Sequence, residues 1–225
     1  MKSLLEISYL GNKLEVIVFV GNTNKIKRYF NDIIFPSDDV SLSENFTINR
    51  IQEVDYMNSW RITQPIFFKN EDKKYDFYNN LNSMNTNDLQ LWKINQAIPS
   101  LDSEINGKNN PLELGLTDLI DFNKGCYLGQ ETMSKIRNVS SLKQEIRIWS
   151  SKAKNLNLES VDKNIFNNHN KEKLVGYITS FYKLDSQKIK GLAMIKRKYL
   201  DKENSFFSDN FGQISIDKSV GSTFL

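Results

Sequence analysis

The sequence predicts an α+β protein that ends in a small β-barrel, and three patterns lead to that prediction. Two apolar runs, Leu4 to Leu10 and Leu14 to Val20, flank Gly11-Asn12 and are typical of a β-hairpin. Apolar residues at helical spacing follow the hairpin. In the last third of the chain, short runs of alternating apolar and polar residues recur between polar connections, which is typical of an all-β domain. We therefore predict two domains, residues 1–145 and 146–225.

Caps and breakers define the elements expected in the first domain. Asn22 and Thr23 are good helix N-caps, and the helix that they begin is expected to reach Pro36. Its apolar stripe is Ile26, Phe30, Ile33 and Ile34. Polar clusters then separate three expected strands, Val40–Leu42, Thr47–Ile51 and Trp60–Phe68.

A loop is expected from Lys69 to Asn87, followed by a helix from Asp88 to Ile98 that Pro99 ends. Pro111 to Phe122 is expected to form a helical turn that leads to a third helix ending at Arg137. Beyond it, alternation predicts the strands of a barrel with five or six strands in all. The predicted strands are Leu142–Ile148, Leu174–Tyr182, Ile189–Ile195 and Gly212–Ile216.

Composition bounds the partners that this chain is expected to have. With 225 residues, of which 39% are hydrophobic, the chain can bury a sizeable core. Its net charge of +3 is too balanced for a dedicated nucleic-acid arm. Residues 171–200 hold eight Lys or Arg and two acidic residues, which would attract an anionic ligand. A solvated strand face explains these charges more simply, and we expect no direct contact with nucleic acid.

One cysteine and one histidine limit the redox and metal chemistry that the chain can carry. Cys126 has no second cysteine to pair with, and Cys126 and His169 do not make a self-contained zinc or iron–sulfur ligand set. No run approaches the ~18 apolar residues of a membrane span, and Glu6 interrupts any leader-like apolar stretch. We expect no metal site, no membrane contact and a cytoplasmic location.

The segment Lys124-Gly125-Cys126-Tyr127-Leu128-Gly129-Gln130-Glu131 concentrates functional groups in eight positions. If Gly129 precedes a helix, the helix's free N–H groups and the Lys124 ammonium would both favour a thiolate at Cys126. The glycines would let the backbone approach a ligand, and Tyr127 could stack on a planar ring. A buried, unreactive cysteine on a tight turn is the alternative interpretation.

This segment resembles the K-G-C-Y-x-G-Q-E signature of the YgfZ family of folate-binding proteins, and every signature position is matched. Lys93 to Pro99 is similar to the family's R-I-E-x-G-x-P segment, and Pro111 to Phe122 to its P-L-E-x-G-L lead-in. Asp38-Asp39-Val40 and Val175 to Ile195 also match in order, so the resemblance covers most of the chain.

The resemblance implies a fold like that of the glycine-cleavage T-protein, with ferredoxin-like lobes around a folate channel. It implies tetrahydrofolate or a derivative as cofactor, and iron–sulfur client proteins, including enzymes that thiolate transfer RNA. By the resemblance, Cys126 and Lys124 would carry the chemistry. The expected ligand-binding residues are Lys93, Asn95, Gly125, Tyr127, Gly129, Gln130 and Glu131.

The chain departs from the family pattern in two respects. The family has a further N-terminal segment before the hairpin that opens here, so the folate-binding domain is expected to lack its first part. In the R-I-E-x-G segment, Lys93 replaces the arginine, Asn95 the acidic residue and Ala97 the glycine. Lysine cannot reproduce the planar bidentate contact of arginine, so weaker folate binding is expected.

Two alternatives to the YgfZ-like interpretation remain open. One is a T-protein-like aminomethyltransferase, which needs a carboxylate beside the folate early in the sequence. The first aspartate is Asp32, within the expected first helix, and Glu6 lies on a strand. The other alternative is a docking module for iron–sulfur proteins that no longer binds folate.

Overall fold

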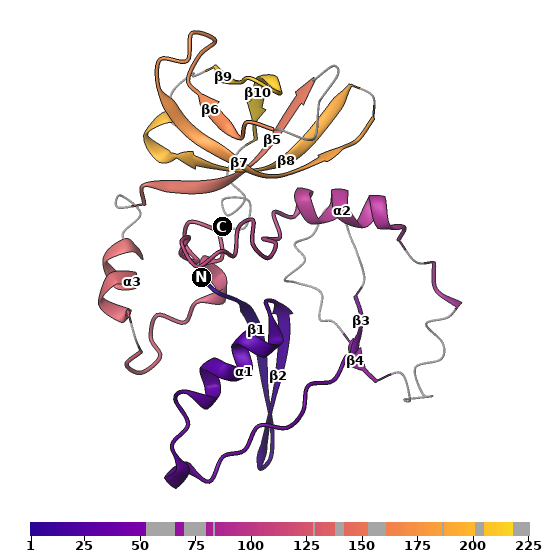
Figure 1. The fold of residues 1–225 in the computed structure, drawn as a ribbon, viewed down its shortest axis with the longest axis vertical. Helices are drawn as coiled ribbons and strands as arrows, with labels where there is room; N and C mark the ends of the chain where they lie inside the picture. The colour runs from indigo at the N-terminus through magenta and orange to yellow at the C-terminus, as the bar shows by residue number, and fades with distance from the viewer. Residues whose placement is uncertain are drawn as a thin grey trace. The chain divides into compact units, whose positions relative to one another are not determined.

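The computed structural model describes residues 1–52, 66–69, 80–82, 84–127, 129–137, 142–152, 161–185, 187–200 and 205–217. The chain forms two compact units, residues 2–89 and Met1 with residues 90–225. Figure 1 shows the helices and strands of each unit. The described elements confirm an α+β protein with a closed β-barrel.

The first unit opens with the predicted hairpin. Strand β1 (Leu4–Leu10) pairs with β2 (Lys13–Val20) in antiparallel register. Helix α1 (Thr23–Asn31) begins as predicted, because the Asn22 side chain accepts a hydrogen bond of 3.0 Å from the Lys25 N–H. The helix ends well before Pro36. The Ile33 side chain is 66% exposed, so tertiary packing does not stabilise a further helical turn there.

The rest of the first unit contains less strand than we predicted. Residues Pro36–Asp38 form a 3-10 turn, and Val40–Leu42 is not a strand. Val40 is 55% exposed, so its β-branched side chain has little sheet packing to favour a strand. Strand β3 (Asn49–Ile51) pairs with β4 (Ile66–Phe68), and the earlier part of the expected Trp60–Phe68 strand lies outside the described residues.

The second predicted helix is displaced toward the N-terminus. Helix α2 spans Thr86–Asn95, because Asn85 caps it by accepting a 2.9 Å hydrogen bond from the Asp88 N–H. The Ile98 N–H then bonds to the Lys93 carbonyl across Ala97, whose φ is +46°. A left-handed residue just after a helix is most often glycine. The similar R-I-E-x-G-x-P segment has glycine where this chain has Ala97, in agreement with that preference. Within the expected turn at Pro111–Phe122, only the 3-10 segment Thr117–Leu119 is regular.

The predicted terminal barrel is confirmed and has six strands. They are β5 (Gln144–Lys152), β6 (Asn164–Phe166), β7 (Leu174–Lys183), β8 (Lys188–Lys196), β9 (Phe206–Ser208) and β10 (Gly212–Ile216). Their order around the barrel is β10-β5-β8-β7-β6-β9, with β9 and β10 paired to close it. Closure removes the free edges that an open sheet would expose.

Aromatic rings fill the barrel. Trp149 and Phe211 are fully buried, with ring centroids 4.8 Å apart in an edge-on contact, and Phe181 lies 5.2 Å from Phe211. The Trp149 indole N–H donates to the Leu192 carbonyl at 3.1 Å. A Cβ on Gly191 would lie 2.1 Å from the Ser180 carbonyl oxygen, so the close approach of β7 and β8 requires glycine there.

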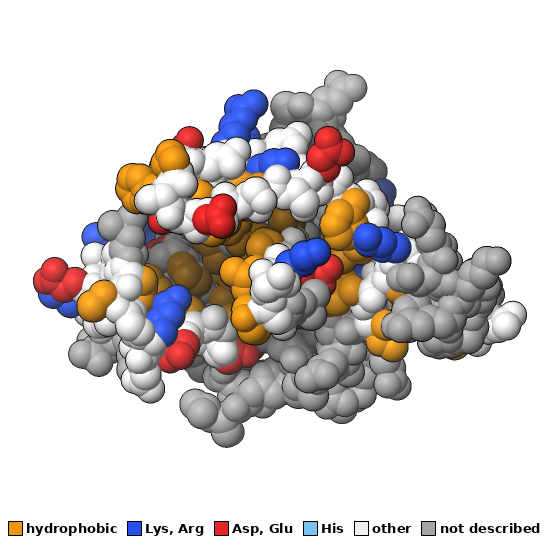
Figure 2. Space-filling model, turned by 90° about the horizontal axis from the view of Figure 1, so that it is seen from below, with side chains coloured by type: hydrophobic (Ala, Val, Ile, Leu, Met, Phe, Trp, Pro, Cys, Tyr) orange, Lys and Arg blue, Asp and Glu red, His pale blue; other side chains and the backbone are white. Residues whose placement is uncertain are grey.

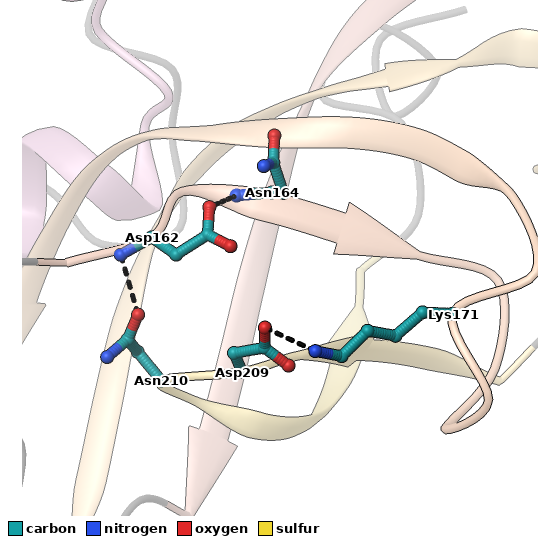
Figure 3. A network of polar contacts seen from close by, with 5 residues as sticks. All are labelled: Asp162, Asn164, Lys171, Asp209 and Asn210. Carbon is teal, nitrogen blue, oxygen red and sulfur yellow. Dashed lines mark hydrogen bonds and ion pairs between the residues drawn. The ribbon is translucent and has the colours of Figure 1, made fainter.

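Polar contacts join the short strands β6 and β9 to the turns beside them (Figure 3). Asn210 Oδ1 accepts a 2.6 Å hydrogen bond from the Asp162 N–H, and Asp162 in turn accepts from the Asn164 N–H at 2.9 Å. Lys171 Nζ lies 2.6 Å from Asp209 Oδ2. Both strands have three residues, which is too short for alternation to reveal them from sequence.

Among the described residues, no helix is long and apolar enough to cross a membrane. The T-protein-like lobes stay a prediction, because the described strands of the first unit form two separate two-stranded sheets. The domain boundary near residue 145 also stays a prediction.

Candidate functional site

The predicted signature segment leads into helix α3 (Gln130–Arg137), whose first two residues are the last two of the signature. Lys124, Gly125 and Cys126 are exposed, and Tyr127 is half-buried. The alternative expectation of a buried cysteine is therefore wrong, while the reactivity of the thiol stays a prediction. The thiol is open to a reagent, a ligand or a partner protein.

Lys124 contacts the aromatic ring of the loop. Its Nζ lies 4.6 Å from the centroid of the Tyr127 ring, a cation–π distance. The Tyr127 hydroxyl oxygen is buried and has no hydrogen-bond partner in the described structure. A buried hydroxyl without a partner is unfavourable, so a bound polar group that reached it would be stabilised.

The two glycines of the loop differ in what the fold requires of them. Gly129 has φ +87°, a left-handed conformation that a side chain would strain. Its carbonyl accepts the Met133 N–H at 3.0 Å, and the Gln130 N–H donates to the Tyr127 carbonyl at 3.1 Å. Gly125 has no positive φ, and a Cβ there would meet no atom within 4 Å. The fold thus explains Gly129 but leaves Gly125 for a ligand or partner to explain.

Glu131 faces solvent on α3. Its carboxylate pairs with Lys135 Nζ at 2.5 Å, one helical turn away, and the two side chains are 83% and 74% exposed. Gln130 is half-buried at the start of the same helix. The structure therefore places Glu131 in a surface ion pair, and its contact with a ligand stays a prediction.

Helix α2 carries the second group of predicted site residues. Lys93 and Asn95 are half-buried, and Asn95 Oδ1 is a buried acceptor without a partner in the described structure. On the same helix, Trp92 is 3% exposed, and its indole N–H likewise has no partner there. The Trp92 N–H donor and the Asn95 Oδ1 acceptor, three residues apart in sequence, are thus both buried without a hydrogen-bond partner in the described structure.

Asn95 Oδ1 and the Trp92 N–H are an acceptor and a donor of the kinds that a folate ring pairs with. A pterin presents N–H donors beside ring and carbonyl acceptors, which match Asn95 Oδ1 and the Trp92 N–H. Among the described residues, no hydrogen bond or ion pair joins α2 to the signature loop. The described contacts therefore do not bring the two predicted groups together.

A buried carboxylate that we did not predict lies between α2 and the barrel in sequence. Glu104 is fully buried, and its Oε2 accepts hydrogen bonds from the Ser100 N–H at 2.9 Å and hydroxyl at 2.6 Å. Its Oε1 has no partner in the described structure. Residues 101–110 are polar and lack periodicity, so no sequence signal marked this glutamate for burial.

Asn109 links this turn to the barrel. It is 2% exposed, and its side-chain N–H donates to the Glu104 carbonyl at 2.9 Å. The Tyr177 hydroxyl on β7 donates to Asn109 Oδ1 at 3.4 Å. Burial raises the pKa of Tyr177 above its usual 10, and the nearby Glu113 carboxylate adds to the rise. The cluster is a structural anchor between turn and barrel.

The first unit has a shallow hollow and exposed apolar side chains, and neither includes a predicted site residue. The hollow, of about 350 Å³, is lined by Ile34, Phe35, Pro36, Asp39, Val40 and Ser41. Figure 2 shows hydrophobic side chains lying open among scattered charged ones. On the hairpin, the exposed ones are Ile7, Tyr9, Leu14 and Val16. In the described part of the chain, no three His, Cys, Asp or Glu side chains gather as a metal site would require.

Comparison with known proteins gives distant relatives. The chain is 27% identical over 151 residues to the tRNA-modifying protein YgfZ of Aliivibrio fischeri strain MJ11, an alignment that covers 64% of this chain and 46% of that protein. The YgfZ protein of strain ES114 is 26% identical over the same shares. A putative chloroplastic transferase of Arabidopsis thaliana is 39% identical over 54 residues, 24% of this chain and 12% of that protein.

The chain therefore spans about half the length of the curated YgfZ proteins that it matches. No protein-family model matches the sequence. At this identity and coverage, the comparisons support a YgfZ-like relationship.

Proposed function

We propose that this chain is a YgfZ-like protein that supports the assembly or repair of iron–sulfur enzymes and thereby the modification of transfer RNA. The observation that carries the proposal is the exposed Cys126 thiol within a complete signature segment that leads into α3. Similarity to proteins named for tRNA modification supports the same role. The cytoplasm is the proposed location.

Folate is the proposed cofactor, and α2 would hold its ring. Asn95 Oδ1 would accept a hydrogen bond from a pterin N–H, and the Trp92 indole would donate one. Each contact would give a buried group the partner that it lacks in the described structure, which favours binding. Lys93 would supply positive charge without the forked geometry of arginine. When bound, tetrahydrofolate would supply one-carbon chemistry.

Cys126 would act on the client's cluster. Its thiolate would bind an iron atom as a transient ligand, and the thiol proton would pass to water. Lys124 is two residues away and stays near the loop through its contact with Tyr127, where its positive charge would attract an anionic client surface. Gly125 would let the client's backbone approach the loop closely.

A docking role without folate is the second candidate, and the exposure of the loop favours it. Lys124, Gly125, Cys126 and Glu131 all face solvent, as a protein-contact surface requires. Nothing comparable favours aminomethyl transfer, because Asp32 is exposed at the end of α1 and Glu6 is exposed on β1.

A tetrahydrofolate titration of the purified chain, followed by tryptophan fluorescence, tests the folate half of the proposal. Trp92 lies beside the proposed ring site, whereas Trp149 is in the barrel core and serves as an internal reference. Asn95→Ala should weaken binding about tenfold, which corresponds to one hydrogen bond of ~1.4 kcal/mol. Cys126→Ser should bind as the parent does.

Three outcomes separate the candidates. Saturable binding that Asn95→Ala weakens supports the folate site on α2. Binding that is unaffected by Asn95→Ala would move the site away from that helix. No binding by the parent chain, together with capture of an iron–sulfur protein that depends on Cys126, would leave the docking role.

A further inference from the structure

Register and burial place several polar side chains on one outer face of the barrel. One row of paired residues crosses four neighbouring strands. It consists of Tyr182 on β7, Lys190 on β8, Ser150 on β5 and Ser215 on β10. Residues opposite each other in antiparallel strands share a face. Their neighbours Phe181, Ile189 and Ser151 point inward, where Ile189 belongs to the core and Phe181 packs against it.

A pair of lysines extends this face by one row. Lys152 on β5 lies directly opposite Lys188 on β8, and both are exposed. We call Lys152, Lys188, Lys190, Tyr182, Ser150 and Ser215 the lysine face. Like charges directly opposite each other destabilise a sheet, so strand pairing gives no reason for this arrangement.

The described carboxylates neutralise the lysine pair only in part, because the Asp185 carboxylate interacts electrostatically with Lys188. Lys190 Nζ lies 3.8 Å from Asp217 Oδ2, but no described carboxylate lies within ion-pair distance of Lys152 or Lys188. Asp185, in the β7–β8 turn, accepts hydrogen bonds from the Gln187 and Lys188 N–H groups at 2.7 and 2.8 Å. Its carboxylate is thereby held on the turn.

We propose that the lysine face binds single-stranded nucleic acid, with Lys152, Lys188 and Lys190 on phosphate groups and Tyr182 stacked against a base. Three observations point to this partner: lysines on neighbouring strands, a half-buried aromatic in the same row, and hydroxyl donors at Ser150 and Ser215. Single-strand binders combine a positive surface that follows the backbone with aromatic platforms for bases.

The proposal differs from the sequence-based expectation that the basic residues between 171 and 200 form a solvated strand face, and it rests on the strand register. An acidic protein surface would use the lysines but has no need of Tyr182, so nucleic acid accounts for more of the face. This inference goes beyond the proposed function and does not depend on folate binding or on Cys126.

The experiment measures how tightly the full chain binds a fluorescein-labelled uridine RNA, by fluorescence anisotropy at a series of salt concentrations. The RNA is about 12 nucleotides long, which fits the site size of a small β-barrel. Lys152→Gln with Lys188→Gln should weaken binding about tenfold at low salt. It should also reduce the salt slope by about 1.4, at ~0.7 for each phosphate that is no longer neutralised. Thermal stability should be unchanged or slightly higher, because a like-charge pair is removed.

Lys163→Gln with Lys173→Gln is the matched control, since both lysines are exposed on the barrel outside the lysine face and the charge change is the same. It should leave the affinity within twofold of the parent's. Equal weakening in the two double variants would overturn the proposal by showing a non-specific charge effect.

Tyr182→Leu separates nucleic acid from other polyanions. RNA affinity should fall about fivefold or more because base stacking is removed, while affinity for heparin, which has no bases, should stay within twofold. Equal weakening for RNA and heparin would overturn the base-stacking assignment, and no RNA binding by the parent at low salt would overturn the whole proposal. Tight heparin binding without RNA binding would instead favour an acidic protein partner.

Discussion

Cys126 is exposed on a loop in which each neighbouring residue contributes differently. Lys124 lies against the Tyr127 ring, and Gly129 supplies the left-handed residue from which α3 begins. Gly125 has neither a conformational nor a steric reason to be glycine in the described structure. This difference allows the fold and the function of the loop to be tested separately.

Gly125→Ala and Gly129→Ala should therefore affect different properties. Gly129→Ala is expected to lower the free energy of unfolding by about 1 kcal/mol, because alanine is strained at φ +87°. Gly125→Ala should change it by less than ~0.5 kcal/mol. Urea unfolding of the two variants measures this, and equal destabilisation by both would show that this loop geometry is wrong.

If a client protein approaches the loop, Gly125→Ala should weaken client capture although stability is unchanged. Pull-down of an iron–sulfur protein by immobilised parent and variant chains measures the effect. Capture that is the same for both would mean that Gly125 contacts no partner.

Asp185 gives a pH-dependent contribution to the β7–β8 turn. Hydrogen bonds from the Gln187 and Lys188 N–H groups lower its pKa below the usual 3.8. A lowered carboxyl pKa stabilises the fold above pH 3.8 and stops doing so as the pH falls through the folded value.

Asp185→Ala should accordingly lower the melting temperature at pH 6, and the difference from the parent should shrink as the pH falls below about 3.8. Thermal melts monitored by circular dichroism at about pH 6, 4 and 3 provide the test. A difference that is constant over this range would contradict the assigned hydrogen bonds.

At the scale of elements, the sequence predicted those helices and strands whose ends are set by local sequence patterns. Gly11-Asn12 between apolar runs predicted the β1–β2 hairpin, and Asn22 predicted where α1 begins. The end of α1 could not be predicted, because the apolar Ile33 and Ile34 continue the stripe while burial does not follow it. Ile33 is 66% exposed.

The candidate site consists largely of residues that the sequence singled out, but their arrangement could not be predicted. The loop 124–131 and α2 were both identified, yet the Glu131–Lys135 ion pair and the burial of Glu104 depend on packing that a single sequence does not reveal. Strands β6 and β9 were missed because each has three residues, and the lysine face emerged only once the strand register was known.

The N-cap of α1 offers a test at this scale. Asn22→Ala removes the side-chain acceptor of the Lys25 N–H and should lower stability by about 1 kcal/mol, whereas Asn22→Asp should preserve it. The helical signal in far-ultraviolet circular dichroism during urea unfolding measures the effect. Equal stability of the alanine variant and the parent would place the start of the helix elsewhere.

At the scale of the whole molecule, burial is uneven between the two units. In the described part of the first unit, the buried apolar residues are Ile17, Ile26 and Phe68, whereas the barrel core alone contains ten. Stability follows buried apolar area, so the barrel should be the more stable part.

Hydrogen exchange followed by mass spectrometry should show this difference. Amides of β5, β7 and β8 should exchange slowest, and those of β1 and β2 orders of magnitude faster. Ile165→Ala, which truncates a fully buried core side chain, should lower barrel protection by about 2–5 kcal/mol and leave the hairpin unchanged. A fall in protection in both units together would show that they unfold as one.

The most direct test of the proposed function is complementation in a bacterium that lacks its own YgfZ protein, with thiolated nucleosides of its transfer RNA quantified by mass spectrometry. The parent chain should restore the modified nucleosides, and Cys126→Ser should restore little although it is expressed and folded. Failure of the parent chain, or full restoration by Cys126→Ser, would contradict the account.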